Sequence, residues 1–137
     1  MNRLPVGIKN ALVQLVGEND FIDGFAIGGS VAKGLVDGND VDVDLLCPSR
    51  GSISAQIERF KPISKTPYST FIETLCKRFH EILHEGPVLH IRKAIRRGLI
   101  SGTEYRSTTI YVFRNEVIAR LWKVFGDQEI YFQEKEE

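Results

Sequence analysis

The chain has 137 residues, 42% of them hydrophobic, with 18 acidic and 18 basic side chains. This length and composition suit a single domain over residues 1–137 with a real hydrophobic core. No apolar run approaches the roughly 20 residues that span a bilayer, and the first residues contain no signal-peptide core. Cys47 and Cys76 lack a metal-type spacing, so we expect a cytoplasmic protein with reduced thiols and no membrane contact.

The charges are unevenly distributed along the chain. Residues 1–50 carry 4 basic and 7 acidic side chains, whereas residues 59–106 carry 10 basic and 4 acidic ones. Such an asymmetry is typical of a site for metal and phosphate, of a nucleic-acid surface, or simply of solvated helix faces.

In the first third of the chain, apolar residues at helical spacing predict a helix over 5–16. The residues 21–29 then read as a strand that runs into a glycine turn. A short helix is expected over 30–36, opening at Ser30. The strict alternation of DVDVDLLC predicts a second strand over 40–47.

The middle of the chain predicts a short helix over 52–60 and a loop over 61–69. Thr70 and Glu73 have the spacing of a capping box and predict the start of the clearest helix. Its apolar stripe ends at the Gly-Pro pair of residues 86–87 and consists of Ile72, Leu75, Phe79, Ile82 and Leu83.

Three further strands are predicted, over 87–95, over the β-branched and aromatic run 106–113, and over 129–132. Asn115 is expected to cap a last helix, although a hairpin over 106–125 is an alternative. The inward face of this helix is predicted to contain Val117, Ile118, Leu121, Trp122 and Phe125, with Gly126 closing it. The fold class is therefore α/β (α+β), with a small mixed sheet flanked by helices.

Three aspartates at every second position form a ladder on one face of the strand over 40–47. Side chains i, i+2 and i+4 of a strand share a face, so the carboxylates of Asp40, Asp42 and Asp44 would lie roughly 6–7 Å apart and repel one another. Bound cations are the simplest compensation, and Mg²⁺ prefers carboxylate oxygens. Two metal ions held by such carboxylates activate an attacking oxygen and stabilise a leaving one.

A glycine turn precedes this ladder. Gly28 and Gly29 let the backbone come close to a ligand. Ser30 begins the next helix, where its hydroxyl and the backbone amides favour an anion such as a nucleotide phosphate. Phosphate donors and metal carboxylates thus fall on two neighbouring strands, which is typical of phosphoryl transfer. A P-loop is excluded because Leu35 stands where lysine is needed.

The segment over residues 21–47 resembles the signature of the DNA polymerase beta-like nucleotidyltransferase superfamily, in particular its minimal members. That signature is an apolar strand, a glycine turn ending in serine, glycine four residues later (Gly34 here), and Asp-x-Asp followed by apolar residues. The resemblance implies a polymerase beta palm-like fold. It also implies an NTP substrate, catalytic metal ions held by two or three of the aspartates, and transfer of a nucleoside monophosphate to a hydroxyl group.

The register of the ladder leaves two metal pairs open. The family spacing from the serine to the first aspartate falls between the positions of Asp40 and Asp42. The metal pair is therefore Asp40 with Asp42, or Asp42 with Asp44.

The third carboxylate of active family members, which comes from a later strand, has no clear counterpart. The predicted strand over 87–95 offers His90 and Arg92 on one face and no acid. The alternatives are Asp44, Glu104 and Glu116. This departure puts catalysis in doubt more than the fold.

Several basic residues are candidates for phosphate or nucleic-acid contacts. Lys33 resembles a basic residue that contacts the triphosphate in similar sequences. The basic run over 91–98 suits nucleotide or RNA, or is a solvated face. His80 and His84 have the i, i+4 spacing of zinc ligands, but a third ligand is not evident.

Two functions follow as expectations. The first is a nucleotidyltransferase that binds an NTP with Mg²⁺ or Mn²⁺, its phosphates held by Gly28, Gly29, Ser30 and Lys33. Its acceptor is RNA, a protein hydroxyl or a small molecule, and we expect a homodimer or a partner chain to complete acceptor recognition. The alternative is a catalytically inactive binding module, antitoxin-like or nucleic-acid-binding.

Overall fold

The computed structural model describes residues 4–20, 22–34, 39–47, 67–100, 105 and 108–133, with the backbone alone for residues 67–70. Its helices are α1 (Val6–Glu18), α2 (Gly29–Ala32), α4 (Pro67–Leu83) and α5 (Glu116–Trp122). Its strands are β1 (Gly24–Ile27), β2 (Asp40–Cys47), β3 (Val88–Arg96), β4 (Ile110–Phe113) and β5 (Glu129–Phe132). Within these described segments, no helix is both long and apolar enough to cross a bilayer.

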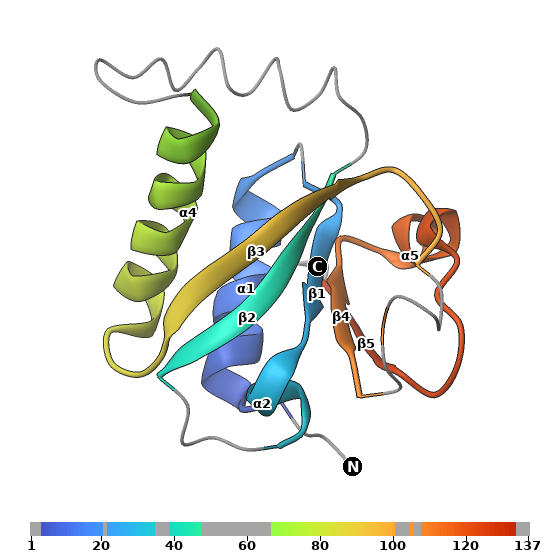
Figure 1. The fold of residues 1–137 in the computed structure, drawn as a ribbon, viewed down its shortest axis with the longest axis horizontal. Helices are drawn as coiled ribbons and strands as arrows, with labels where there is room; N and C mark the ends of the chain where they lie inside the picture. The colour runs from blue at the N-terminus through green and yellow to red at the C-terminus, as the bar shows by residue number, and fades with distance from the viewer. Residues whose placement is uncertain are drawn as a thin grey trace, which may run out of the picture.

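The strands form one mixed sheet in the order β3-β2-β1-β4-β5 (Figure 1). Strand β1 lies at its centre and runs antiparallel to both β2 and β4. The outer pairs, β2 with β3 and β4 with β5, are parallel. The predicted α+β class, with a small mixed sheet flanked by helices, is therefore confirmed.

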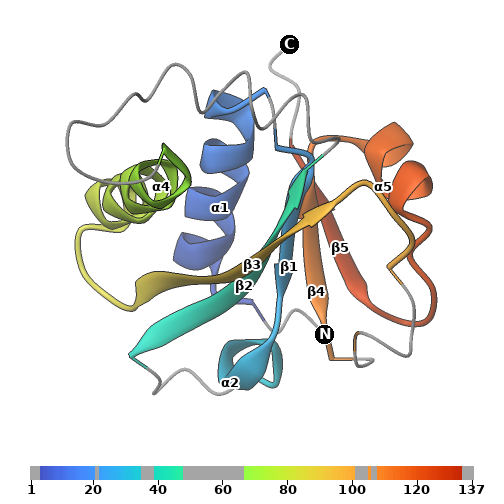
Figure 2. The same ribbon diagram turned by 45° about the horizontal axis from the view of Figure 1, so that its top comes forward.

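The two faces of the sheet are covered differently. Helices α1 and α4 lie side by side over one face (Figure 2), and the larger core cluster joins them to alternate strand residues such as Phe25, Val43 and Val112. The opposite face is covered in part by α5, whose Trp122 packs with Leu46 and its neighbours. Because strand side chains alternate between faces, the aspartates of β2 share the α5 side of the sheet.

Most of the predicted elements are present where the described residues allow a comparison. The helix over 5–16 and the strands over 40–47, 87–95 and 129–132 are confirmed. The Oδ1 atom of Asn115 accepts a hydrogen bond from the backbone N–H of Ile118 at 3.1 Å, so the predicted cap is also confirmed. The predicted helix over 52–60 lies outside the described residues.

Three predictions at element ends were wrong. Helix α4 begins at Pro67, so Thr70 is not its N-cap and the predicted loop ends earlier. Helix α2 is a single turn rather than a helix over 30–36. The strand predicted over 106–113 begins only at Ile110, and α5 replaces the alternative hairpin.

The predicted inward face of the last helix was only partly correct. Trp122 is buried and Ile118 packs against the core, as predicted. Val117, Leu121 and Phe125 are instead about half exposed. The reason is one buried hydrogen bond, in which the Trp122 indole N–H donates to Asp23 at 2.7 Å. That anchor sets the rotation of α5, and its apolar flank faces outward.

We expect Gly24→Ala to lower the free energy of unfolding by about 1–3 kcal/mol or more, because a Cβ at this position would overlap the carbonyl oxygen of Val112 on β4. Gly7→Ala is the matched control, since its Cβ would lie 3.4 Å from the flexible side chain of Leu83. The control should leave stability unchanged or raise it by up to about 1 kcal/mol. Urea unfolding of both variants measures the difference, and equal effects would contradict the packing of β1 against β4.

The buried carboxyl of Asp23 predicts a pH dependence. Burial raises its pKa above the ordinary 3.8, although the Trp122 hydrogen bond and two arginines act in the opposite direction. A carboxyl with a raised folded-state pKa binds more protons when folded, so it opposes folding increasingly as the pH rises from 3.8 through the raised value.

We therefore expect Asp23→Asn to gain stability relative to the wild type as the pH rises through this window, and to show no gain below it. Unfolding titrations at a series of pH values measure the difference. Asp20→Asn is the control, because the Asp20 side chain is 97% exposed. A gain that shrinks with rising pH would contradict the burial of Asp23.

Candidate functional site

The exposure of the three aspartate side chains of the ladder decreases along β2. The side chains of Asp40, Asp42 and Asp44 are 46%, 30% and 3% exposed, respectively. The next residue on this face, Leu46, is fully buried. The three carboxylates therefore occupy different environments, and one chemical role for all three is not expected from the geometry.

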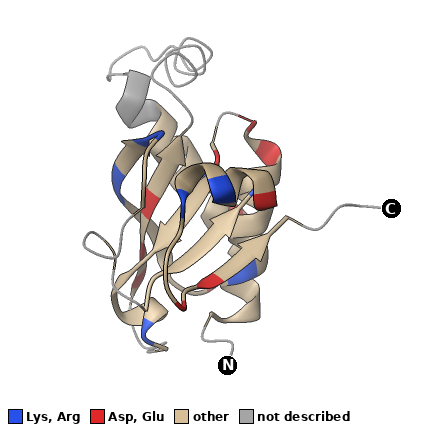
Figure 3. Cartoon of the chain, turned by 90° about the vertical axis from the view of Figure 1, so that its right-hand side faces the viewer, with Lys and Arg blue, Asp and Glu red and all other residues tan. Residues whose placement is uncertain are grey.

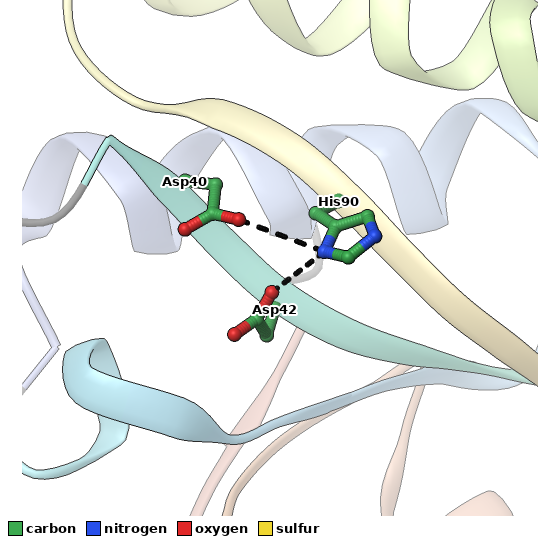
Figure 4. A group of neighbouring side chains, drawn as sticks. All are labelled: Asp40, Asp42 and His90. Carbon is green, nitrogen blue, oxygen red and sulfur yellow. Dashed lines mark hydrogen bonds and ion pairs between the residues drawn. The ribbon is translucent and has the colours of Figure 1, made fainter.

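The two outer aspartates meet a histidine of the neighbouring strand (Figure 4). The parallel register sets His90 of β3 opposite Asp42. The His90 Nδ1 atom lies 2.8 Å from Asp42 Oδ1 and 3.6 Å from Asp40 Oδ2. One ligand atom from each side chain falls within 4.8 Å of the others, which is compatible with one divalent ion.

The inner aspartate has different neighbours. The Tyr105 hydroxyl donates to Asp44 Oδ2 at 2.9 Å. Arg92 Nε lies 3.3 Å from Asp44 Oδ1, which is an ion pair without hydrogen-bond geometry, and Oδ1 accepts no hydrogen bond from the described residues. The geometry thus brings Asp40 and Asp42 together with His90 and leaves Asp44 outside that group.

An irregularity in β3 changes which side chains reach this face. Val43 pairs with Ile91, but Asp44 pairs with Lys93, so Arg92 is an extra residue on β3. Such bulges redirect side chains, and both Arg92 and Lys93 line the pocket described below. As the sequence indicated, β3 places His90 and Arg92 beside the aspartates and supplies no acid there.

A pocket of about 500 Å³ opens between the glycine turn and the inner aspartate. Its volume lies in the range of small-ligand sites. Three cationic side chains and three hydroxyl groups surround a single carboxylate, a set that favours an anionic ligand with several oxygens. The described residues that line it are Gly28, Gly29, Lys33, Asp44, Arg92, Lys93, Tyr105, Thr108 and Thr109.

The glycine turn packs directly against the ladder. Gly29 has φ +68°, and a Cβ there would lie 2.8 Å from Asp42 Oδ2. A Cβ on Gly28 would lie 2.9 Å from Arg92 Nη2. Position 29 therefore requires glycine, whereas the contact at position 28 is with the end of the flexible Arg92 side chain, which can move. Asp42 thus lies between His90 and Gly29, and Gly29 lines the pocket.

The predicted phosphate-binding residues are only partly brought together. Gly28, Gly29 and Lys33 line the pocket, whereas Ser30 does not. Helix α2 has four residues, so it offers only one turn of backbone amides. Lys93 belongs to the basic run over 91–98 that was a candidate for nucleotide contact, whereas Thr108 and Thr109 were not candidates. No local signal identifies these two threonines, because the fold brings them to the pocket from a distant segment.

The other candidate groups remain separate from this site. On the side of the molecule drawn in Figure 3, acidic and basic segments are interspersed rather than gathered into one basic face. His80 lies on α4, whereas His84 follows the end of that helix with φ +62°, and across the described segments neither joins a group of three metal-binding side chains. Glu116 begins α5 and lines a different pocket, and Glu104 lies outside the described residues.

No family model, curated protein or solved structure matches the chain. The grounds for a function are therefore the geometry of this face of the sheet and the resemblance of residues 21–47 to the nucleotidyltransferase signature. Of the residues that carry the resemblance, Gly28, Gly29 and Asp44 line the pocket, whereas Ser30, Gly34, Asp40 and Asp42 do not.

We expect Tyr105→Phe to lower the free energy of unfolding by about 1.5–3 kcal/mol, because it removes the hydrogen bond to the buried carboxylate of Asp44. Tyr131→Phe is the matched control. Its hydroxyl donates to Glu129 in a part-buried site, and its loss should cost less than about 1 kcal/mol. Thermal and urea unfolding measure both variants, and equal losses would argue against a buried, charged Asp44.

Proposed function

We propose that this chain is a nucleotidyltransferase-like domain that binds an NTP with a divalent metal ion and transfers the nucleoside monophosphate to a hydroxyl acceptor. The observation that carries the proposal is the pocket between the glycine turn and the ladder, lined by three cations. An NTP presents a polyphosphate that needs both positive side chains and a metal ion.

In this proposal, the residues that contact the phosphates differ from those that hold the metal ion. Lys33, Arg92 and Lys93 line the pocket and would contact phosphate oxygens, and Gly28 and Gly29 would let the phosphates approach the backbone. Asp40 and Asp42 would hold the ion, Mg²⁺ or Mn²⁺, with Asp44 at the inner end of the ladder. When bound, such an ion neutralises charge and positions the reacting oxygens.

A second candidate is a binding module that takes the nucleotide and transfers nothing. One observation favours it. His90 and Arg92 lie beside the aspartates, whereas active members of the family that the chain resembles carry a third carboxylate there. Such a module would act as an antitoxin-like or nucleic-acid-binding partner. In either case we propose a cytoplasmic location, supported by the two free cysteines. For the enzyme, we propose an RNA or protein acceptor brought by a partner chain or a second copy.

The first experiment measures nucleotide binding and label transfer with the same protein. The chain is incubated with Mg²⁺ or Mn²⁺ and each α-labelled NTP, with RNA and protein acceptors. Transfer that is lost in Asp42→Ala supports the enzyme, whereas binding without transfer under any condition supports the binding module. The absence of both would overturn the proposal.

Matched variants test whether the pocket holds the phosphates. Lys93→Ala should weaken NTP binding about tenfold, as expected for a lost charge-assisted contact, and binding should weaken with added salt. Lys77→Ala, an exposed lysine on α4 away from the pocket, should leave binding unchanged. Equal losses in the two variants would indicate nonspecific attraction rather than a phosphate site.

A further inference from the structure

We infer that Asp40, Asp42 and His90 bind one divalent transition-metal ion, of which Mn²⁺ and Zn²⁺ are the test cases, in preference to Mg²⁺. The inference deepens the proposed function by assigning the metal class, and its metal-binding test is independent of nucleotide. It departs from an all-carboxylate site because one ligand is an imidazole nitrogen.

The sheet itself holds the three ligands in place. Asp40 and Asp42 are two positions apart on β2, and the register of β3 sets His90 directly opposite Asp42. Their ligand atoms converge within 4.8 Å on the side of the sheet away from α1 and α4 (Figure 4). Ligands carried by paired strands are positioned before the ion arrives, which lowers the ordering cost of binding.

The donor set determines which ion is favoured. Carboxylate oxygens accept Mg²⁺, Mn²⁺ and Zn²⁺, whereas an imidazole nitrogen suits transition metals and not Mg²⁺, which keeps oxygen ligands and water. With Asp44 engaged by Tyr105 and Arg92, the described residues offer no third carboxylate to this group. His90 therefore decides the selectivity of the site.

Two further observations point to a ligand on the same face. Asp44 Oδ1 is buried and lies 3.3 Å from Arg92 Nε but accepts no hydrogen bond from the described residues, and Asp44 lines the adjoining pocket. In addition, Gly29 comes so close to Asp42 Oδ2 that a Cβ would lie 2.8 Å away. Asp42 thus presents one oxygen toward His90 and the other toward the glycine turn, so an ion held by the group would adjoin the pocket.

The test is a calorimetric titration of the nucleotide-free chain with Zn²⁺, Mn²⁺ and Mg²⁺ at one pH. We expect one strong site for Zn²⁺ and Mn²⁺, and weaker Mg²⁺ binding. His90→Ala should weaken Zn²⁺ binding about tenfold or more, since even the loss of a residue that only orients a ligand costs that much, while Mg²⁺ binding changes little. His90→Asp should reverse the preference by improving Mg²⁺ binding at the expense of Zn²⁺.

The histidines of the chain provide an independent readout in the wild type. There are three, His80, His84 and His90, so their ring signals in NMR spectra can be assigned by single substitutions. We expect Zn²⁺ to shift, and Mn²⁺ to broaden, the His90 ring signals first. This measurement holds even if a substitution at His90 prevents folding.

His80→Ala is the matched control, because His80, on α4, and His84, just after the end of that helix, are the competing zinc pair predicted from the sequence. This control should leave Zn²⁺ and Mn²⁺ binding unchanged. Loss of zinc binding in His80→Ala, equal affinity for Mg²⁺ and Mn²⁺, or insensitivity to His90→Ala would overturn the inference. If nucleotide binds but the metal preference is missing, only this inference fails; a His90-dependent metal site without nucleotide binding overturns the proposed function alone.

Discussion

Strand β2 carries apolar side chains on one face and acidic ones on the other, and the site depends on this alternation. Val41, Val43 and Leu45 are buried beneath α1 and α4, which fixes the direction of every other side chain on the strand. A slip of one residue would carry the aspartates into that apolar layer at a prohibitive cost. The core therefore sets the register, and the register turns the three carboxylates toward the half of the sheet that α5 covers only in part.

The carboxylates are stabilised by neighbours that differ with depth. Asp42, partly exposed, lies against the His90 ring. Asp44, which is buried, has a tyrosine hydroxyl and the guanidinium of Arg92. A buried charge needs both a counter-charge and hydrogen bonds, and the extra residue in β3 supplies the former. The same irregularity turns Lys93 toward the pocket, so Arg92 and Lys93 both line it although they are adjacent in sequence.

The local features of this site can be predicted from the sequence, but the contacts between distant segments cannot. The aspartate ladder and the glycine turn can be predicted from the sequence, because alternation with a period of two and a pair of glycines are local patterns. The helix cap at Asn115 can be predicted for the same reason. The bulge in β3 has no such pattern, and a strictly alternating strand would have turned Lys93 away from the pocket. The rotation of α5 was missed for a related reason, since it depends on the contact of Trp122 with Asp23, about a hundred residues earlier in the chain.

His90 and Arg92 of β3 lie beside the aspartates, and they have unequal consequences for the two halves of the face. An imidazole is still a metal ligand, so the outer half, with Asp40 and Asp42, keeps the chemistry of a cation site. A guanidinium cannot ligate a metal but binds phosphate oxygens well, so the inner half, around Arg92, keeps the chemistry of an anion site. A polyphosphate lying across both would meet a metal ion at one end and fixed positive charge at the other. If the proposed function holds, this division would let a nucleotide bind without the third carboxylate of a two-metal arrangement, so nucleotide binding and transfer are separate questions for this chain.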